Sequence, residues 1–510
     1  MFPILTAITF VPLVGMLIVM FLDDDELIKR VSLLVSLVPL LLSAYLWIAY
    51  AGTAGGIQFE ELRTWIPSVG IAYHLGVDGF SVPLIFLTTL LATISLGYSY
   101  LNIFDRVKEY FALFLLLETG LLGVFVSLDL FMFYVFWEIE LLPMYFLIGI
   151  WGGPRREYAA IKFFLYTLAG SVFMLLAIIA VAINQHTFDI VQVTNATAAG
   201  HGPFAASMLL QSLAFLGFFL GFAIKVPIWP FHTWLPDAHV EAPTAGSIIL
   251  AGVLLKLGTF GFVRILMPFF PDAFRTFAIP IGFLAFTSIV YGALVAMAQW
   301  DFKKLIAYSS VNHMGYVILG LTAAMAASNA NLEARVIAVN GAVLQMFNHG
   351  IITGALFMLV GFIYDQRTHE RDFRKFGGLW AITPVYGSFL MFASFASLGL
   401  PGLAGFVSEF MVFRGALAAG DGNFAMGLMT VLSVLGIVVT AAFFLWKVIQ
   451  MILLGPANER WKGVADLNMA EVLALAPLVF FMVFVGVYPA PVLNVINATS
   501  RSMLIALGLG

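Results

Sequence analysis

The chain has 510 residues, of which 62% are hydrophobic, 15% are aromatic and only 10% are charged. This composition lies far from that of soluble globular proteins and excludes a chain with one core and a water-facing surface. The net charge is −4, and the sequence has no basic stripe that would indicate nucleic-acid binding. The lack of any cysteine excludes thiolate-held iron–sulfur clusters, cysteine-based zinc sites and disulfides within the chain.

Apolar runs recur from one end of the sequence to the other, and each is long enough to cross a bilayer core of about 30 Å. The first run, residues 2–22, has no positively charged flank before it, so we expect an uncleaved span. Hydropathy predicts about 14 spans. In chain order their centres lie near Val14, Leu40, Thr89, Leu121, Ile139, Val172, Phe218, Leu255, Ser288, Ile318, Thr353, Ser397, Leu435 and Phe480. Because the loops are short, we expect one all-α polytopic membrane domain over residues 1–510.

The basic residues are distributed unequally between the two sets of loops. Fourteen lie in loops after odd-numbered spans, and six lie in loops after even-numbered spans or near the C-terminus. The positive-inside rule therefore predicts that the odd-span loops face the cytoplasm and that both termini face the periplasm.

Two blocks of sequence repeat at an offset of 184 residues. "FFLYTLAGSVFML" (163–175) aligns with "FNHGIITGALFML" (347–359), and "GFAIK" (221–225) aligns with "GFVSE" (405–409). The matched spans are sixth with eleventh and seventh with twelfth. An odd shift reverses the direction of insertion, so we expect inverted repeats, in which Lys225 superposes on Glu409.

Six of the ionisable residues inside predicted spans are candidates for a functional role, because a charge at membrane depth costs about 2.5–3.5 kcal/mol and indicates function by default. Acids, amines and imidazoles that can be neutral or charged are the groups that a proton relay requires. The six candidates are Glu138 in the fifth span, Lys225 in the seventh, Lys256 in the eighth, His313 in the tenth, His349 in the eleventh and Glu409 in the twelfth.

Helix-breaking residues lie beside two of these candidates. Pro227 and Pro230 follow Lys225, and Pro401 precedes Glu409. Broken helices at membrane depth are tolerated where protein or a hydrated cavity satisfies the freed backbone groups, so these breaks favour points of proton transfer. A packing kink is the alternative.

Other interpretations of the same residues remain open. In one interpretation, Glu138 and Lys225 form only a static ion pair. In another, His313 and His349 are packing residues held by hydrogen bonds. Lys447 near the end of its span can extend to the interface. The roles of Glu118, Glu140 and Lys162 are ambiguous. The segment that carries His232, His239 and Glu241 has no zinc-ligand spacing and is expected to be an interfacial loop without metal.

Four long motifs resemble the antiporter-like membrane subunits of respiratory complex I, the proton-translocating NADH–quinone oxidoreductase. They are "DLFMFYVFWEIELLPMYFLIGIWGG", "KVPIWPFHTWLPDAHVEAPTAGS", "DFKKLIAYSSVNHMGY" and "LGLPGLAGFVSEFM". The family also includes the large subunits of Mrp-type sodium/proton antiporters. Its L-type members carry a lysine in helix 12 and its M-type members a glutamate, so Glu409 fits the M type.

The resemblance implies 14 helices, with helices 4–8 and 9–13 as inverted five-helix repeats and with helices 7 and 12 broken. The corresponding divisions are residues 1–105 for helices 1–3, 106–270 for the first repeat, 271–456 for the second and 457–510 for helix 14. It also implies that Glu138 pairs with Lys225, and that Lys256, His313 and His349 form a central axis leading to Glu409.

The activity implied by the resemblance is proton translocation driven by quinone reduction in partner subunits. FMN, iron–sulfur clusters and quinone are expected in those partners and no cofactor in this chain. The expected neighbours are the sister subunits L and N and membrane lipid, in a bacterial inner membrane. An Mrp-type antiporter and a scaffold subunit that pumps nothing are the alternatives.

Overall fold

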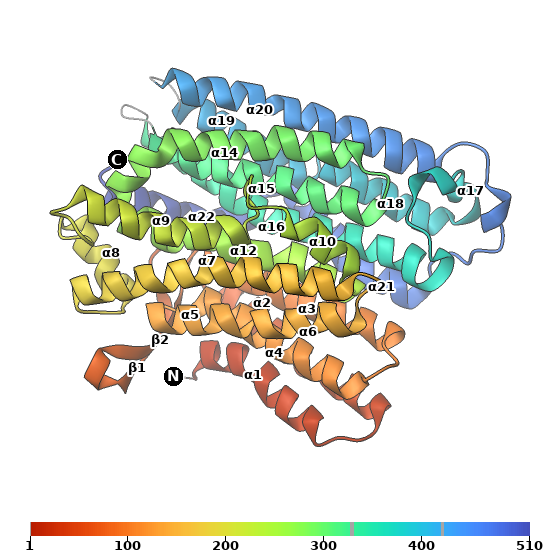
Figure 1. The fold of residues 1–510 in the computed structure, drawn as a ribbon, viewed down its shortest axis with the longest axis horizontal. Helices are drawn as coiled ribbons and strands as arrows, with labels where there is room; N and C mark the ends of the chain where they lie inside the picture. The colour runs from red at the N-terminus through yellow and green to blue at the C-terminus, as the bar shows by residue number, and fades with distance from the viewer. Residues whose placement is uncertain (1, 327–330, 420–422, 510) are drawn as a thin grey trace.

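The computed structural model describes residues 2–326, 331–419 and 423–509 of the chain. Long helices run nearly parallel to one another and form a bundle, and a small β-hairpin lies at one end of it (Figure 1). The described helices that form or contribute to spans are α1 (Ile4–Met20), α2 (Asp25–Ala49), α3 (Ser81–Asn102), α4 (Val107–Val126), α5 (Leu130–Ile139), α6 (Leu141–Trp151), α7 (Arg156–Gln185), α9 (Met208–Lys225), α10 (Trp234–Glu241), α11 (Thr244–Ile249), α12 (Leu255–Gly261), α13 (Met267–Phe269), α14 (Pro271–Ala298), α15 (Phe302–Ala326), α16 (Leu332–Ile363), α18 (Pro384–Ser397), α19 (Ala404–Ala419), α20 (Phe424–Phe443) and α21 (Met469–Val487).

The all-α membrane fold predicted from the sequence is confirmed. Within the described residues, 11 helical segments are long and apolar enough to cross a membrane. The three other predicted spans correspond to the 17-residue α1, to α15 and to the interrupted pair α18–α19. Each of the 14 predicted span centres lies within a described helix, and the eighth centre, Leu255, is the first residue of α12.

The seventh and twelfth spans are broken where the prolines predict. Helix α9 ends at Lys225, and the chain resumes helical structure only at α10. The freed backbone groups find new partners: Trp229 donates its N–H to Ser288 Oγ at 2.8 Å, and Trp234 Nε1 donates to the carbonyl oxygen of Ile224 at 2.9 Å. Side chains thus satisfy the backbone inside the bundle, as an apolar medium requires.

The second break separates α18 from α19. Gly399 and Gly402 there have φ of +80° and +92°, a conformation that residues with a Cβ rarely adopt. The glycines on either side of Pro401 let the chain turn and re-enter a helix before Glu409.

Two of the irregularities that were not predicted lie close to relay candidates. The fifth span is interrupted between α5 and α6 at Glu140, three residues before Pro143, which lacks the N–H needed to continue the helical ladder. In the eighth span, α12 is flanked by the π-helical segments η2 (Leu250–Leu254) and η3 (Phe262–Leu266). Such wide turns are frequent at functional sites, and Lys256 lies between them.

Several described elements lie outside the predicted set of spans, among them the short helices α8 (Ile190–Ala198) and α17 (Leu379–Ile382). The strands β1 (Gln58–Ile66) and β2 (Ile71–Val77) pair antiparallel between α2 and α3. A helix α22 (Ala490–Ala506) follows α21, so residues 457–510 hold more than the single helix that we expected. The backbone of α22 approaches Gly52 and Gly79 closely and its Asn497 bonds Asn340 at 2.8 Å, so α22 lies against loops and helices at one end of the bundle.

Candidate functional site

The ionisable residues predicted from the sequence lie within the bundle. Lys225 is 1% exposed and Lys256 is fully buried, while His313, His349 and Glu409 are also buried. Glu138 is partly buried. Since isolated charges at this depth are costly, the partners of these groups determine what they can do.

Four of the candidates form a continuous row across the second half of the molecule. Lys256 Nζ on α12 lies 2.7 Å from His349 Nδ1 on α16. The rings of His349 and His313 lie 5.7 Å apart, centroid to centroid. His313 Nδ1 on α15 lies 2.9 Å from Oε1 of Glu409 on α19. The structure thus brings together an amine, two imidazoles and a carboxyl group that come from four different helices.

Neighbouring side chains and backbone groups fix the geometry of this row. Gln345 Nε2 donates to Glu409 Oε1 at 3.3 Å, and Ser408 Oγ donates to Gln345 Oε1. Lys256 Nζ also donates to the carbonyl oxygen of Ala251 at 2.6 Å, within the π-helical segment η2. The wide turn therefore helps to orient the amine toward His349.

A cavity of about 10 Å³ lies between His313, His349 and Glu409 and is also lined by Ser397. This volume is close to the smallest that can hold one water molecule. His313 Nε2 lies 3.3 Å from Ser397 Oγ at the same place. A water here would have polar partners on several sides, as a buried water requires.

The expected pairing of Lys225 differs in the structure. Its ammonium contacts Oε1 of Glu140, not Glu138, and both partners of the pair are buried. Residues two apart on a helix point to different sides, so Glu138 and Glu140 cannot present their carboxylates to one point equally. The sequence offered a signal, since a second acid follows Glu138 in the same span, but it did not distinguish which one faces Lys225.

Aromatic rings complete the surroundings of this pair. Lys225 Nζ lies 5.2 Å from the ring centroid of Trp137 and 5.9 Å from that of Phe163. Ring faces attract a cation when it is removed from water, so they add to the stabilisation that Glu140 provides.

The two halves of the site meet where α9 contacts α12. A Cβ at Gly258 would lie 2.8 Å from the carbonyl oxygen of Phe222 and 3.0 Å from the backbone nitrogen of Val226. The helices that carry Lys225 and Lys256 therefore touch through backbone atoms. No direct contact joins the two lysines among the interactions of the described residues.

The ambiguous residues have different surroundings. Glu118 on α4 is buried, and neither of its oxygens has a hydrogen-bond partner among the described residues. Lys162 pairs with Asp237 at 2.7 Å, and Lys447 donates to the carbonyl oxygen of Gln299. Both lysines thus connect neighbouring segments, outside the row.

The expectation of an interfacial loop at His232 and His239 is wrong. Both imidazoles are buried, and no nitrogen of either has a hydrogen-bond partner among the described residues. The segment folds back into the bundle because α10 continues the broken seventh span. No group of three or more His, Cys, Asp or Glu side chains in the described parts of the chain has an arrangement that could hold a metal ion.

Comparison with known proteins adds an independent line of evidence. A family model described as "NADH:quinone oxidoreductase/Mrp antiporter, TM" matches residues 127–436. The chain is 39% identical to NADH-quinone oxidoreductase subunit M of Rickettsia prowazekii (strain Madrid E), over 99% of both chains. In solved structures, it is similar to a chain of respiratory complex I from Thermus thermophilus with bound NADH, with a TM-score of 0.85, 28% identity and coverage of 99% of this chain and 100% of that chain. A chain of the Mrp complex from Dietzia sp. DQ12-45-1b shares the fold, with a TM-score of 0.81 at 22% identity, covering 98% of this chain but only 51% of that chain.

The broken spans and the buried row of acids and bases define a membrane protein of the antiporter-like class. With a family model that covers most of its helices and a relative matched from end to end, the chain belongs to the NADH:quinone oxidoreductase/Mrp antiporter family.

Proposed function

We propose that this chain acts as the M-type membrane-arm subunit of a complex I and moves protons across the membrane through its buried row. The observation that carries the proposal is the close succession of ionisable groups from Lys256 through His349 and His313 to Glu409, in which both end pairs lie within hydrogen-bond distance and the two imidazoles line one small cavity. Each of these groups can accept a proton on one side and release one on the other, which a structural ion pair does not require.

The transfer steps follow the contacts. A proton held as the ammonium of Lys225 passes to the neutral amine of Lys256 through water at the contact of α9 and α12. Lys256 then gives a proton to His349 Nδ1, and the imidazolium of His349 transfers one through the small cavity to His313. His313 Nδ1 finally gives a proton to the carboxylate of Glu409, which releases it on the opposite side of the membrane.

The pair formed by Lys225 and Glu140 controls the first step. While Glu140 contacts the ammonium, the proton stays on Lys225, because an adjacent opposite charge in a medium of low dielectric constant favours the charged form. A shift at the break between α5 and α6 separates the pair and releases the proton. After this shift, Glu138, two residues earlier, is the second carboxylate available to Lys225. For this reason Glu138 remains among the proposed relay residues.

The energy for pumping comes from outside the chain. Moving one charge against 100 mV costs about 2.3 kcal/mol. In this proposal, partner subunits with FMN, iron–sulfur clusters and quinone supply the energy, and the sister subunits L and N are the nearest neighbours. The membrane is the bacterial inner membrane, with both termini on the periplasmic side, and the two half-units are residues 106–270 and 271–456.

The test is NADH-driven proton pumping in membrane vesicles that carry variants of this chain in the assembled complex. Lys225→Ala and Glu138→Ala are each expected to reduce pumping at least tenfold, on the order of the contribution of a single acid–base group. Reduction of an artificial acceptor by NADH reports that the redox arm is intact. Normal pumping by Lys225→Ala would exclude the proposed route.

The Mrp-type antiporter is the weaker alternative. The end-to-end identity with a subunit M favours complex I, whereas the Mrp chain shares only the fold and extends well beyond this one. Sodium-dependent transport would favour the Mrp alternative. Full pumping by Glu409→Ala would instead favour a scaffold subunit.

A further inference from the structure

A cavity of about 930 Å³ lies between the start of α1, the strand β1 and the helix α5. Figure 1 shows the hairpin beside the N-terminal end of α1, at one end of the bundle. Glu61 on β1 accepts the backbone N–H of Leu5 at 2.8 Å and that of Thr6 at 3.2 Å. These bonds hold β1 against the end of α1, so the strand forms one wall of the cavity.

The floor of the cavity is apolar and extends into the membrane-spanning part of the chain. The rings of Phe10 on α1 and Phe136 on α5 lie 6.0 Å apart, centroid to centroid, and both line the cavity. Further along α5 the lining runs from Met132 to Ile139, a rise of about 10 Å. A groove of this length between two spans has the shape and the setting of a site for a lipid acyl chain.

The mouth of the cavity carries one charge without a counter-charge. Glu60 bonds His74 at 2.8 Å, and the charge of Glu61 is compensated by the positive end of α1, whose N–H groups it accepts. Arg63 lines the mouth, is exposed, and has no ion pair or side-chain hydrogen bond among the described residues. Trp65 beside it is half exposed, as tryptophans at a membrane interface commonly are.

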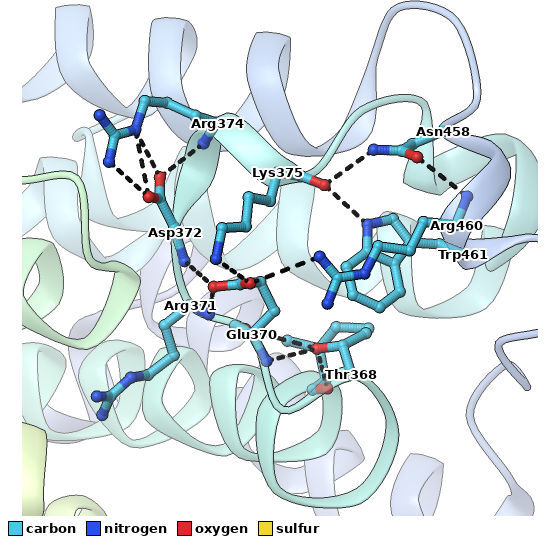
Figure 2. Close-up of polar contacts among 10 residues, drawn as sticks. Thr368, Glu370, Arg371, Asp372, Arg374, Lys375, Asn458, Arg460 and Trp461 are labelled. Atoms are coloured by element: carbon cyan, nitrogen blue, oxygen red, sulfur yellow. Dashed lines mark hydrogen bonds and ion pairs between the residues drawn. The ribbon is translucent and has the colours of Figure 1, made fainter.

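A second pocket, of about 400 Å³, differs in this respect. Figure 2 shows that the charged groups in and around it pair with one another. Glu370 accepts from Lys375 at 2.7 Å, and Asp372 accepts from Arg374 at 2.6 Å. Its charges are thus compensated within the protein, whereas Arg63 has no such partner in the part of the chain that the structure describes.

We propose that the cavity between α1, β1 and α5 is a binding site for a phospholipid of net negative charge. The guanidinium of Arg63 donates to the phosphate oxygens, for which its planar fork of N–H groups is suited. One acyl chain lies in the groove beside Phe10 and Phe136, and the ring of Trp65 packs at the level of the headgroup. The proposal does not depend on the proton route through the buried row.

The test uses the purified, assembled complex in vesicles of phosphatidylcholine that contain a photoactivatable lipid with a diazirine in one acyl chain. A phosphatidylglycerol probe is compared with a phosphatidylcholine probe, and labelled peptides are located by mass spectrometry. The peptides of α1 and α5 at the cavity are expected to be labelled more by the phosphatidylglycerol probe. Arg63→Gln should lower the ratio of phosphatidylglycerol to phosphatidylcholine labelling about fivefold, because one arginine near a membrane surface contributes about that factor to the attraction of anionic lipid.

The matched control is Arg414→Gln. Arg414 on α19 is also exposed and also without an ion pair among the described residues, but it does not line the cavity. Its variant should keep the parent labelling ratio at α1 and α5. An equal fall in both variants would indicate a general effect of surface charge and overturn the site.

Val135→Trp tests the position of the acyl chain, because Val135 lines the groove and a larger side chain there fills it. This variant should lower the labelling of α1 and α5 by both probes, and unchanged labelling would overturn the placement. If Val135→Trp does not assemble, Arg63→Gln alone decides, since that side chain is exposed.

Two results with the parent complex would also overturn the proposal. Absence of labelling at the cavity would mean that a neighbouring subunit covers it. Equal labelling by the two probes would mean that the groove accepts any lipid without recognition of the headgroup.

Discussion

The ion pair of Lys225 with Glu140 leads to the sharpest prediction, because the resemblance to known subunits points to Glu138 instead. Glu140→Gln leaves the buried ammonium with a neutral amide as its neighbour. Removing one partner of a buried pair costs about 3–5 kcal/mol, since the remaining charge is out of water and uncompensated. Pumping should therefore fall at least tenfold, and the detergent-solubilised complex should lose this subunit at a lower temperature.

The double variant Glu140→Gln with Lys225→Met provides the control. Replacing both members of a buried pair by neutral groups is often close to neutral for stability, so the heat resistance should return. Pumping should not return, because the amine that carries the proton is gone. The measurements are the temperature of subunit loss and the rate of vesicle acidification.

Glu138→Gln tests which carboxylate holds the lysine. It should reduce pumping but leave the temperature of subunit loss within a few degrees of the parent, because the contact with Glu140 remains. The reverse pattern would refute the assignment. In that pattern Glu140→Gln has a normal temperature of subunit loss, whereas Glu138→Gln lowers this temperature and the additional substitution Lys225→Met restores it.

Two further predictions concern the contact of α9 with α12 and the hairpin. Gly258→Ala places a Cβ against the backbone of α9 and is expected to lower the stability of the folded subunit by about 1–3 kcal/mol. The measurement is the amount of this subunit in the assembled complex, which should fall. An unchanged amount would mean that the two helices separate freely. On β2, His74 bonds Asp189 and Glu60, each at 2.8 Å; burial lowers the pKa of His74, but these two carboxylates outweigh it and raise that pKa above its usual value. A raised pKa means that the contribution to stability is complete at acid pH and is lost as pH rises through the folded-state pKa. Amide hydrogen exchange in β1 and β2, corrected for the intrinsic effect of pH, should thus become faster as the pH rises above the ordinary histidine pKa of about 6.5, and His74→Phe should abolish this dependence; an unchanged dependence in that variant would contradict the assignment.

Much of the site could be predicted from the sequence because charged residues in apolar spans are rare. Lys256, His313, His349 and Glu409 were identified on that ground alone, and the structure places all four in one row. The broken helices were equally visible, since proline removes a backbone donor wherever it occurs.

Other features depend on tertiary contacts that periodicity does not encode. Whether Glu138 or Glu140 faces Lys225 depends on where the break between α5 and α6 falls. Moving the break by one residue rotates the direction of each following side chain about the helix axis by about 100°. The loop-like composition around His239 gave no sign that this segment returns to the bundle. The π-helical turns around Lys256 likewise follow from packing against neighbouring helices and have no simple sequence pattern.

The most direct test of the buried row is the number of protons moved per NADH by the purified complex in liposomes, with Lys256 replaced by Met. The row predicts a clear fall in that ratio, or a loss of coupled turnover, because the amine that donates to His349 Nδ1 is removed. An unchanged ratio at full turnover would contradict the central claim that protons pass through Lys256, His349, His313 and Glu409.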